Sequence, residues 1–186
     1  SEIRSGQPEG PYLLGGFSGG GLTAYEMAQQ LQAEGEETAA LILLDTPLPL
    51  RPELSRRDKA LIKWAELRSK GIGYLGEWIS NRIAWEIEKR RYAASGDSAA
   101  PVFNNRKVEL AFRAALPAYD LQPWSGPLTL FRPPLDRHWQ VSAGNWVSRE
   151  REYVFDDNDW TRWAPAVEVV EVPGDHDSMV LVPNVS

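Results

Sequence analysis

The sequence of 186 residues contains no cysteine and only two histidines. The missing cysteines exclude disulfide bonds, thiolate metal sites and a cysteine nucleophile. Basic residues are also scarce, with 20 lysines and arginines against 26 aspartates and glutamates and a net charge of -6. This balance argues against a nucleic-acid binder and against a protein of acidic membrane surfaces, because both need a basic face.

Long hydrophobic runs are absent too. No apolar stretch approaches the roughly 20 residues that a membrane-spanning helix requires. The first ten residues, SEIRSGQPEG, have no apolar core and do not resemble a signal peptide. We therefore expect a cytoplasmic protein with no membrane association, and a length that suits one compact domain.

The apolar pattern of the first third predicts a strand over residues 11–17, a helix over 21–34 and a strand over 38–44. The last of these is continuously apolar, as in parallel strands covered on both faces. Together they predict one βαβ unit. Further on, the pattern predicts helices within 58–92 and over 105–118, strands over 126–132 and 167–172, and an irregular segment between the two strands.

Residues 16–20, GFSGG, fit the pattern G-x-S-x-G between the first strand and the helix. This pattern places Ser18 on a sharp turn as a candidate nucleophile, where Gly16 and Gly20 would let the strand and the helix meet. The backbone N–H of Gly19, at the positive end of the helix, would stabilise an oxyanion. A phosphate-binding loop also lies between strand and helix, but the lysine of such a loop is missing here.

A nucleophilic serine needs a base. His176 follows the last predicted strand in VEVPGDHDSM, so it can return to the carboxyl edge of the sheet where Ser18 lies. We expect His138, in the irregular segment, to be a loop histidine without a catalytic role.

The acid that orients the histidine has several candidates. Asp45 directly follows the strand over 38–44, at the edge where ligands and catalysts gather in open α/β sheets. The alternatives are Asp156, Asp157 and Asp159, upstream of the last strand. Asp175 and Asp177 lie too close to His176 in sequence and are expected to be turn or capping residues.

Two segments carry a family resemblance. Residues 8–49, from PEGPYLLGGFSGGG to LILLDTPLP, resemble the nucleophile region of the type I thioesterase domains of polyketide synthases and nonribosomal peptide synthetases, and EVPGDHDSMVLVPNV resembles their histidine region. The resemblance implies an α/β-hydrolase fold, a mostly parallel sheet with helices on both faces. It also implies Asp45 as the acid and a helical lid inserted over about 50–122.

The same resemblance implies a function. Such domains take an acyl or peptidyl chain from the phosphopantetheine arm of a carrier protein onto the serine and release it by hydrolysis or cyclisation, with no metal or other cofactor. Family members have strands before the nucleophile strand, so the 186 residues are expected to be an N-terminally truncated domain. The unpaired edge of the nucleophile strand invites pairing with a second copy of the chain, so a homodimer is one expected partner. Alternatives are a carboxylesterase or lipase of the same fold, or a catalytically impaired interaction domain.

Overall fold

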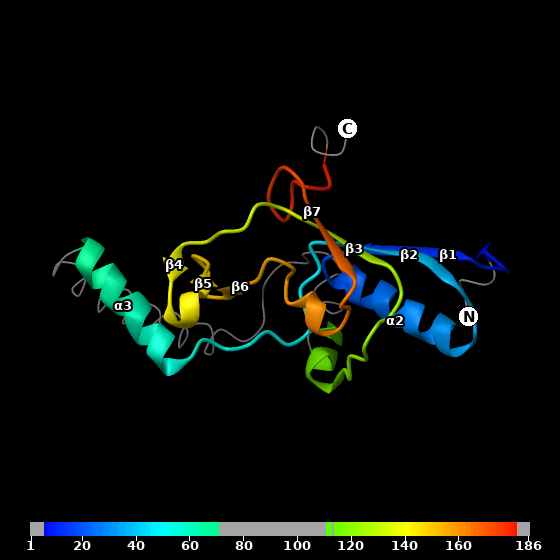
Figure 1. Cartoon of the computed structure of the whole chain (residues 1–186), viewed down its shortest axis with the longest axis horizontal. Coiled ribbons are helices and arrows are strands. Elements are labelled where there is room, and N and C mark those ends of the chain that lie inside the picture. The colour runs from blue at the N-terminus through cyan, green and yellow to red at the C-terminus, as the bar shows by residue number, and fades with distance from the viewer. Residues whose placement is uncertain (1–5, 71–110, 113, 182–186) are drawn as a thin grey trace, which may run out of the picture.

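The computed structural model describes residues 6–70, 111–112 and 114–181. Its main sheet has four parallel strands in the spatial order β1-β2-β3-β7 (Figure 1). These strands are β1 (Tyr12–Phe17), β2 (Thr38–Leu44), β3 (Leu128–Arg132) and β7 (Val167–Glu171). Each matches a strand that the apolar pattern predicts, and the parallel pairing confirms the α/β class.

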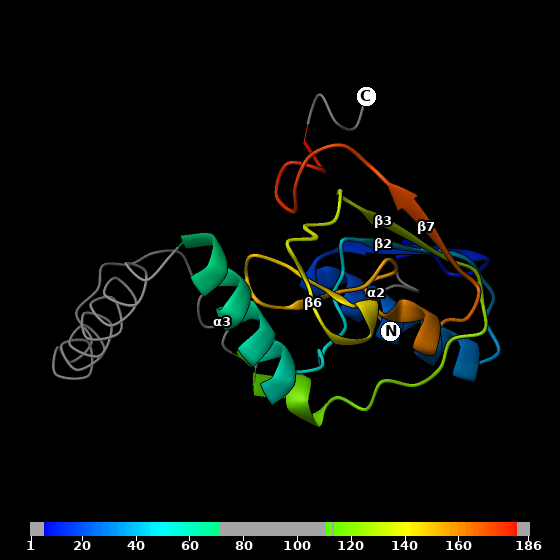
Figure 2. The ribbon, with the colours of Figure 1, turned by 60° about the vertical axis from the view of Figure 1, so that its left-hand side comes forward.

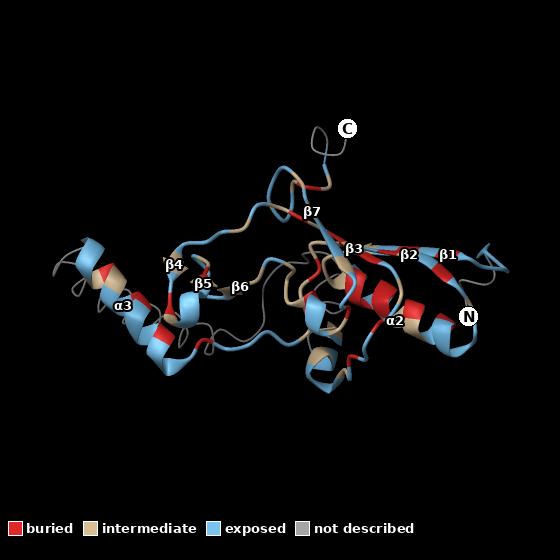
Figure 3. Ribbon diagram, in the orientation of Figure 1, coloured by how far each residue is buried: buried red, intermediate tan, exposed pale blue. Residues whose placement is uncertain are grey.

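The helix α2 (Gly19–Ala33) connects β1 to β2 and packs on one face of the sheet (Figure 2). Its buried residues Leu22, Tyr25, Ala28 and Leu31 form one core with residues from alternate positions of the strands, including Leu14, Leu41, Leu43, Leu128 and Leu130. Figure 3 shows this buried stripe along the helix. The predicted βαβ unit is therefore present, and its two parallel strands place their carboxyl ends at the same edge of the sheet.

Two aromatic residues extend this core beneath α2. The ring of Tyr25 lies 4.9 Å from the ring of the fully buried Trp160 and 6.4 Å from that of Trp124. On the opposite face of the sheet, Leu13 is 72% exposed and Ile42 is 37% exposed. Among the described residues, α2 is the helix that packs on this sheet.

A second, smaller sheet lies between the main sheet and the helix α3 (Arg56–Lys70) (Figure 1). It consists of the antiparallel strands β4 (Trp139–Gln140), β5 (Trp146–Val147) and β6 (Tyr153–Val154). Most of the segment between β3 and β7 is irregular, as predicted, but the sequence does not indicate these three strands, because strands of two residues are too short to show an alternating pattern. Three short 3-10 helices complete the described elements: η1 (Leu116–Ala118), η2 (Ser142–Gly144) and η3 (Trp160–Arg162).

Asp58 joins α3 to the second sheet. Its carboxylate accepts hydrogen bonds from the Ser55 hydroxyl, the Ser142 backbone N–H and hydroxyl, and the Tyr153 hydroxyl. These hydrogen bonds, those from the Ser142 and Tyr153 side chains above all, hold the pKa of Asp58 well below its ordinary value. The anchor of α3 is thus an ionised, buried carboxylate.

The predicted helical lid over about 50–122 lies partly outside the described residues. α3 corresponds to the first predicted helical piece, and residues 111–112 and 114–115 are helical before η1. Residues 71–110 are not described, so the extent of the lid and the single domain over 1–186 stay predictions.

Candidate functional site

Ser18 occupies the turn between β1 and α2, where the sequence places it. It is the N-cap of α2, with φ 52° and ψ -124°. A positive φ is uncommon for a residue other than glycine, and such strain gathers at functional sites. The Ser18 N–H donates to the Leu44 carbonyl over 2.9 Å, so the neighbouring strand holds the turn in place.

The glycines around Ser18 have different roles. A Cβ on Gly16 would lie 2.3 Å from the carbonyl carbon of Gly20, which confirms that the strand and the helix approach too closely for a side chain there. A Cβ on Gly20 would meet nothing within 4 Å. The prediction that Gly20 must lack a side chain for the strand and the helix to meet is therefore wrong. Gly21 makes the other close approach, since its Cβ would lie 1.9 Å from the Thr46 hydroxyl oxygen.

Gly19, whose N–H is the predicted oxyanion donor, is the first residue of α2. A Cβ added to Gly19 would lie 3.0 Å from the ring of Phe112. Phe112 belongs to the segment that the sequence predicts as part of the lid, and its ring lies over the start of α2.

Asp45 and His176 meet, although 131 positions separate them. Asp45 follows β2, and its N–H donates to the Phe131 carbonyl over 2.7 Å. His176 Nδ1 lies 2.7 Å from Asp45 Oδ2. A carboxylate accepts, so Nδ1 carries the proton and Nε2 is left to act as a base. The His176 ring stacks on Phe17, the residue before Ser18, with 4.8 Å between ring centroids.

This pair is only partly shielded from solvent. The Asp45 side chain is 18% exposed and that of His176 is 45% exposed. Ser18, Asp45 and His176 all lie at the carboxyl end of the parallel strands, the edge where sites form in this class of sheet. The structure therefore gathers all three predicted residues at one edge.

The alternative acids have other contacts. Asp156 pairs with Arg137, and Asp159 pairs with Arg162 over 2.9 Å. Burial raises the pKa of Asp157, but hydrogen bonds from Thr161 and other groups of its turn outweigh burial, so the net pKa is lowered. These carboxylates stabilise their own loop.

The remaining predictions for His138 and Asp175 concern turns. The His138 ring packs edge-on against Trp139, and the backbone N–H of His138 donates to the Val147 carbonyl beside the second sheet. Asp175 caps its turn by accepting from the Ser178 N–H over 2.9 Å, and its hydrogen bonds to Ser178 lower its pKa. The interpretation of Asp175 as a turn residue is confirmed.

Sequence reasoning missed Asn158. Its side-chain N–H donates to Asp45 Oδ1 over 3.1 Å. The only sequence signal is its position among the three aspartates of residues 156–159, and in such a cluster the carboxylates are the obvious candidates for the acid.

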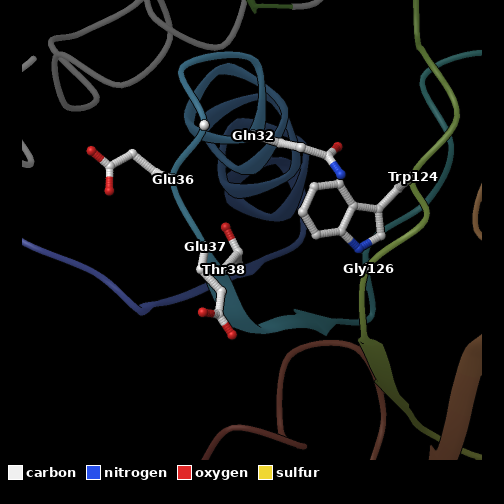
Figure 4. Close-up of a pocket in the computed structure, with 7 residues that line it drawn as sticks. Gln32, Glu36, Glu37, Thr38, Trp124 and Gly126 are labelled. Carbon is white, nitrogen blue, oxygen red and sulfur yellow. The ribbon is translucent and has the colours of Figure 1, made fainter.

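A cavity of about 320 Å³ lies away from these residues (Figure 4). It is lined by the end of α2, the start of β2 and the approach to β3: Gln32, Gly35, Glu36, Glu37, Thr38, Trp124 and Gly126. This is the amino end of the strands, opposite the edge that carries Ser18.

Within residues 6–70, 111–112 and 114–181, no group of three histidines or carboxylates could hold a metal ion. No described helix is long and apolar enough to cross a membrane.

Comparison with known proteins gives matches of two kinds. Residues 1–87 match the family model described as "Thioesterase domain". A segment of 49 residues, 26% of this chain, is 57% identical to the non-reducing polyketide synthase pks27 of Aspergillus flavus. A segment of 50 residues, 27% of this chain, is 58% identical to the non-reducing polyketide synthase terA of Aspergillus terreus. Each match spans 2% of the synthase.

The fold is similar to that of solved thioesterase domains. The NocB thioesterase domain, in covalent complex with a fluorophosphonate nocardicin G analog, aligns over 96% of this chain and 62% of its own, with 26% identity and a TM-score of 0.53. The four-domain nonribosomal peptide synthetase AB3403 aligns over 99% of this chain and 14% of its own, with 26% identity and a TM-score of 0.57. The fold is therefore that of an α/β-hydrolase.

Proposed function

We propose, from the premise that residues 1–87 belong to the thioesterase domain family, that this chain is a serine hydrolase acting on thioesters. Its substrates are acyl, polyketide or peptidyl chains on the phosphopantetheine arm of a carrier protein. The observation that carries the proposal is the 2.7 Å contact between His176 Nδ1 and Asp45 Oδ2, beside the strained turn of Ser18. A base oriented by a carboxylate next to such a serine is what acyl transfer requires.

In the proposed reaction, Ser18 Oγ attacks the thioester carbonyl while His176 Nε2 takes the hydroxyl proton. The tetrahedral intermediate then collapses, the carbon–sulfur bond breaks, and the proton passes from His176 to the leaving thiolate. The acyl chain is now an ester of Ser18. Water, or a hydroxyl or amine of the same chain, attacks this ester with His176 as base, and Ser18 regains its proton.

Asp45 holds the imidazole in the tautomer that leaves Nε2 free and stabilises the imidazolium that forms. The Gly19 N–H donates to the oxyanion at the amino terminus of α2. Such a donor is worth about 100- to 1,000-fold in rate. The residues need no metal or redox cofactor for these steps.

The partners and setting are part of the same proposal. The matched synthases and the four-domain peptide synthetase contain further domains, and a carrier protein in the same assembly would deliver the substrate. Phe112 against Gly19 supports the lid over about 50–122 within one domain. A homodimer paired along β1, tested by sedimentation velocity, and a cytoplasmic location stay predictions.

The test combines a probe and a substrate on the full chain. A fluorophosphonate should label the chain and its Ser125→Ala control, in which an exposed serine beside the cavity is removed, but not Ser18→Ala. Acyl-N-acetylcysteamine hydrolysis should follow the same pattern. Steady hydrolysis by Ser18→Ala would disprove the mechanism. Faster turnover of matched oxygen esters would assign a carboxylesterase, and a wild-type chain that the probe does not label would indicate an interaction domain.

A further inference from the structure

Both oxygens of the Asp45 carboxylate are hydrogen-bonded, and the two donors come from different loops. His176 Nδ1 lies 2.7 Å from Oδ2, and the Asn158 amide donates to Oδ1 over 3.1 Å. A carboxylate held at one oxygen can still turn about its last torsion, whereas donors at both oxygens fix its plane. From this geometry we infer that Asn158 is a positioning residue for the Asp45–His176 pair. The inference rests on the proposed function.

The loop holds Asn158 in place through its own hydrogen bonds. Asn158 has φ 51°, a left-handed conformation that asparagine adopts more readily than most residues. Its N–H donates to the Phe155 carbonyl, and the neighbouring Asp157 carboxylate accepts from the Asp159 and Thr161 N–H groups. The hydrogen bonds of the loop backbone therefore orient the Asn158 side chain toward Asp45.

Two buried anchors join this loop to the strands. The indole N–H of the fully buried Trp160 donates to the carbonyl of Thr46, the residue after Asp45, over 2.8 Å. Arg132, buried at the end of β3, donates from Nε to the Asp156 carbonyl over 2.7 Å. Asn158 lies between these anchors, so the loop and Asp45 share one rigid frame.

The choice of an amide matters electrostatically. Asparagine donates to Asp45 without adding charge, whereas aspartate at the same position would place a second carboxylate against Oδ1. Asp175 and Asp177 flank His176 and also carry negative charge. Because every variant retains them, their effect on His176 is the same in each and does not affect the comparison. Glycine at 158 removes the donor alone, whereas aspartate removes the donor and adds a negative charge, so comparing the two variants isolates the effect of charge.

The experiment compares three variants of the full chain. Asn158→Gly tolerates the left-handed backbone and removes the amide donor, and Asn158→Asp keeps the shape, also removes the donor, and adds a negative charge. Asn145→Gly, at an exposed asparagine between η2 and β5, is the control. We expect Asn158→Gly to slow fluorophosphonate labelling of Ser18 by about tenfold or more. We expect Asn158→Asp to move the midpoint of the pH–rate profile up by about half a pH unit, because the added charge stabilises the imidazolium.

A second readout needs no activity. The Nδ1 proton of a histidine bound to a carboxylate gives a far-downfield NMR signal, and His138 is the only other histidine. This signal should persist in Asn145→Gly and weaken in Asn158→Gly. Wild-type labelling and an unchanged signal in Asn158→Gly would overturn the inference, as would the absence of the signal from the wild type. A wild-type chain that shows the signal but is not labelled would count against the proposed function alone.

Discussion

Replacing Gly16 by alanine should damage the junction of β1 and α2 severely. The new Cβ would lie 2.3 Å from both the carbonyl carbon and the carbonyl oxygen of Gly20, and 2.6 Å from the Gly21 nitrogen. All three atoms are backbone atoms of the first turn of α2, so no side chain can rotate away. To restore normal contact the strand and the helix must separate by about 1 Å. Overpacking of this kind costs about 1–3 kcal/mol, and a rigid backbone puts the cost at the upper end.

Gly20→Ala is the matched control, because it adds the same methyl group to the other partner of the same contact. Gly20 is exposed, and its Cβ would meet nothing within 4 Å. In a helix, alanine is favoured over glycine by up to about 1 kcal/mol. The two variants should therefore differ by about 3–4 kcal/mol in the free energy of unfolding.

Urea denaturation followed by tryptophan fluorescence measures this difference. Gly16→Ala should unfold at a much lower urea concentration than the wild type, or fail to accumulate as folded protein. Gly20→Ala should unfold at the wild-type concentration or above it. Equal midpoints for the two variants would refute the close approach of β1 and α2 that defines the turn of Ser18.

Two further predictions concern buried hydrogen bonds. Because the pKa of Asp58 is lowered in the folded state, the ionised carboxylate stabilises the fold at pH values above the ordinary aspartate pKa. This contribution is lost as the pH falls through the pKa of the folded state. The Asp58→Asn variant should therefore have a smaller free energy of unfolding at neutral pH, and this free energy should depend less on acid than that of the wild type. Trp160→Phe leaves the Thr46 carbonyl without its donor and should lose about 1–3 kcal/mol of unfolding free energy. Trp139→Phe, at a half-buried tryptophan of the second sheet, should lose less.

The βαβ unit could be predicted because its signals are local and strong. The continuous apolar run of β2, the helical spacing of α2 and the glycines between strand and helix all point to the same arrangement. Ser18 and Asp45 then follow from topology, because adjacent parallel strands end side by side. In the structure Phe17 pairs with Leu44, one residue before each of them.

The distinct roles of the glycines could not be predicted. G-x-S-x-G treats Gly16 and Gly20 alike, yet only Gly16 faces the backbone of the other element. Which side of a helical residue meets a strand depends on how the helix lies on the sheet. The same holds for Gly21, whose tight contact is with Thr46, 25 positions further on in the sequence. The contacts of Gly16 and Gly21 depend on tertiary packing, so the local sequence pattern does not indicate them.

His176 reaches Asp45 across an intervening strand, and this explains what the sequence can and cannot place. β7 lies beyond β3 in the sheet, so the turn after β7 must pass over the end of β3 to bring His176 to Asp45 and Phe17. The return is predictable, because parallel strands deliver all their carboxyl ends to one edge. Asn158 lies instead in the long connection between β3 and β7, whose path no periodicity determines. Its approach to Asp45 depends on Trp160 being buried beneath α2, a tertiary contact. The parallel sheet thus specifies where Ser18, Asp45 and His176 lie, whereas the hydrogen bond from Asn158 to Asp45 depends on the packing of the connection.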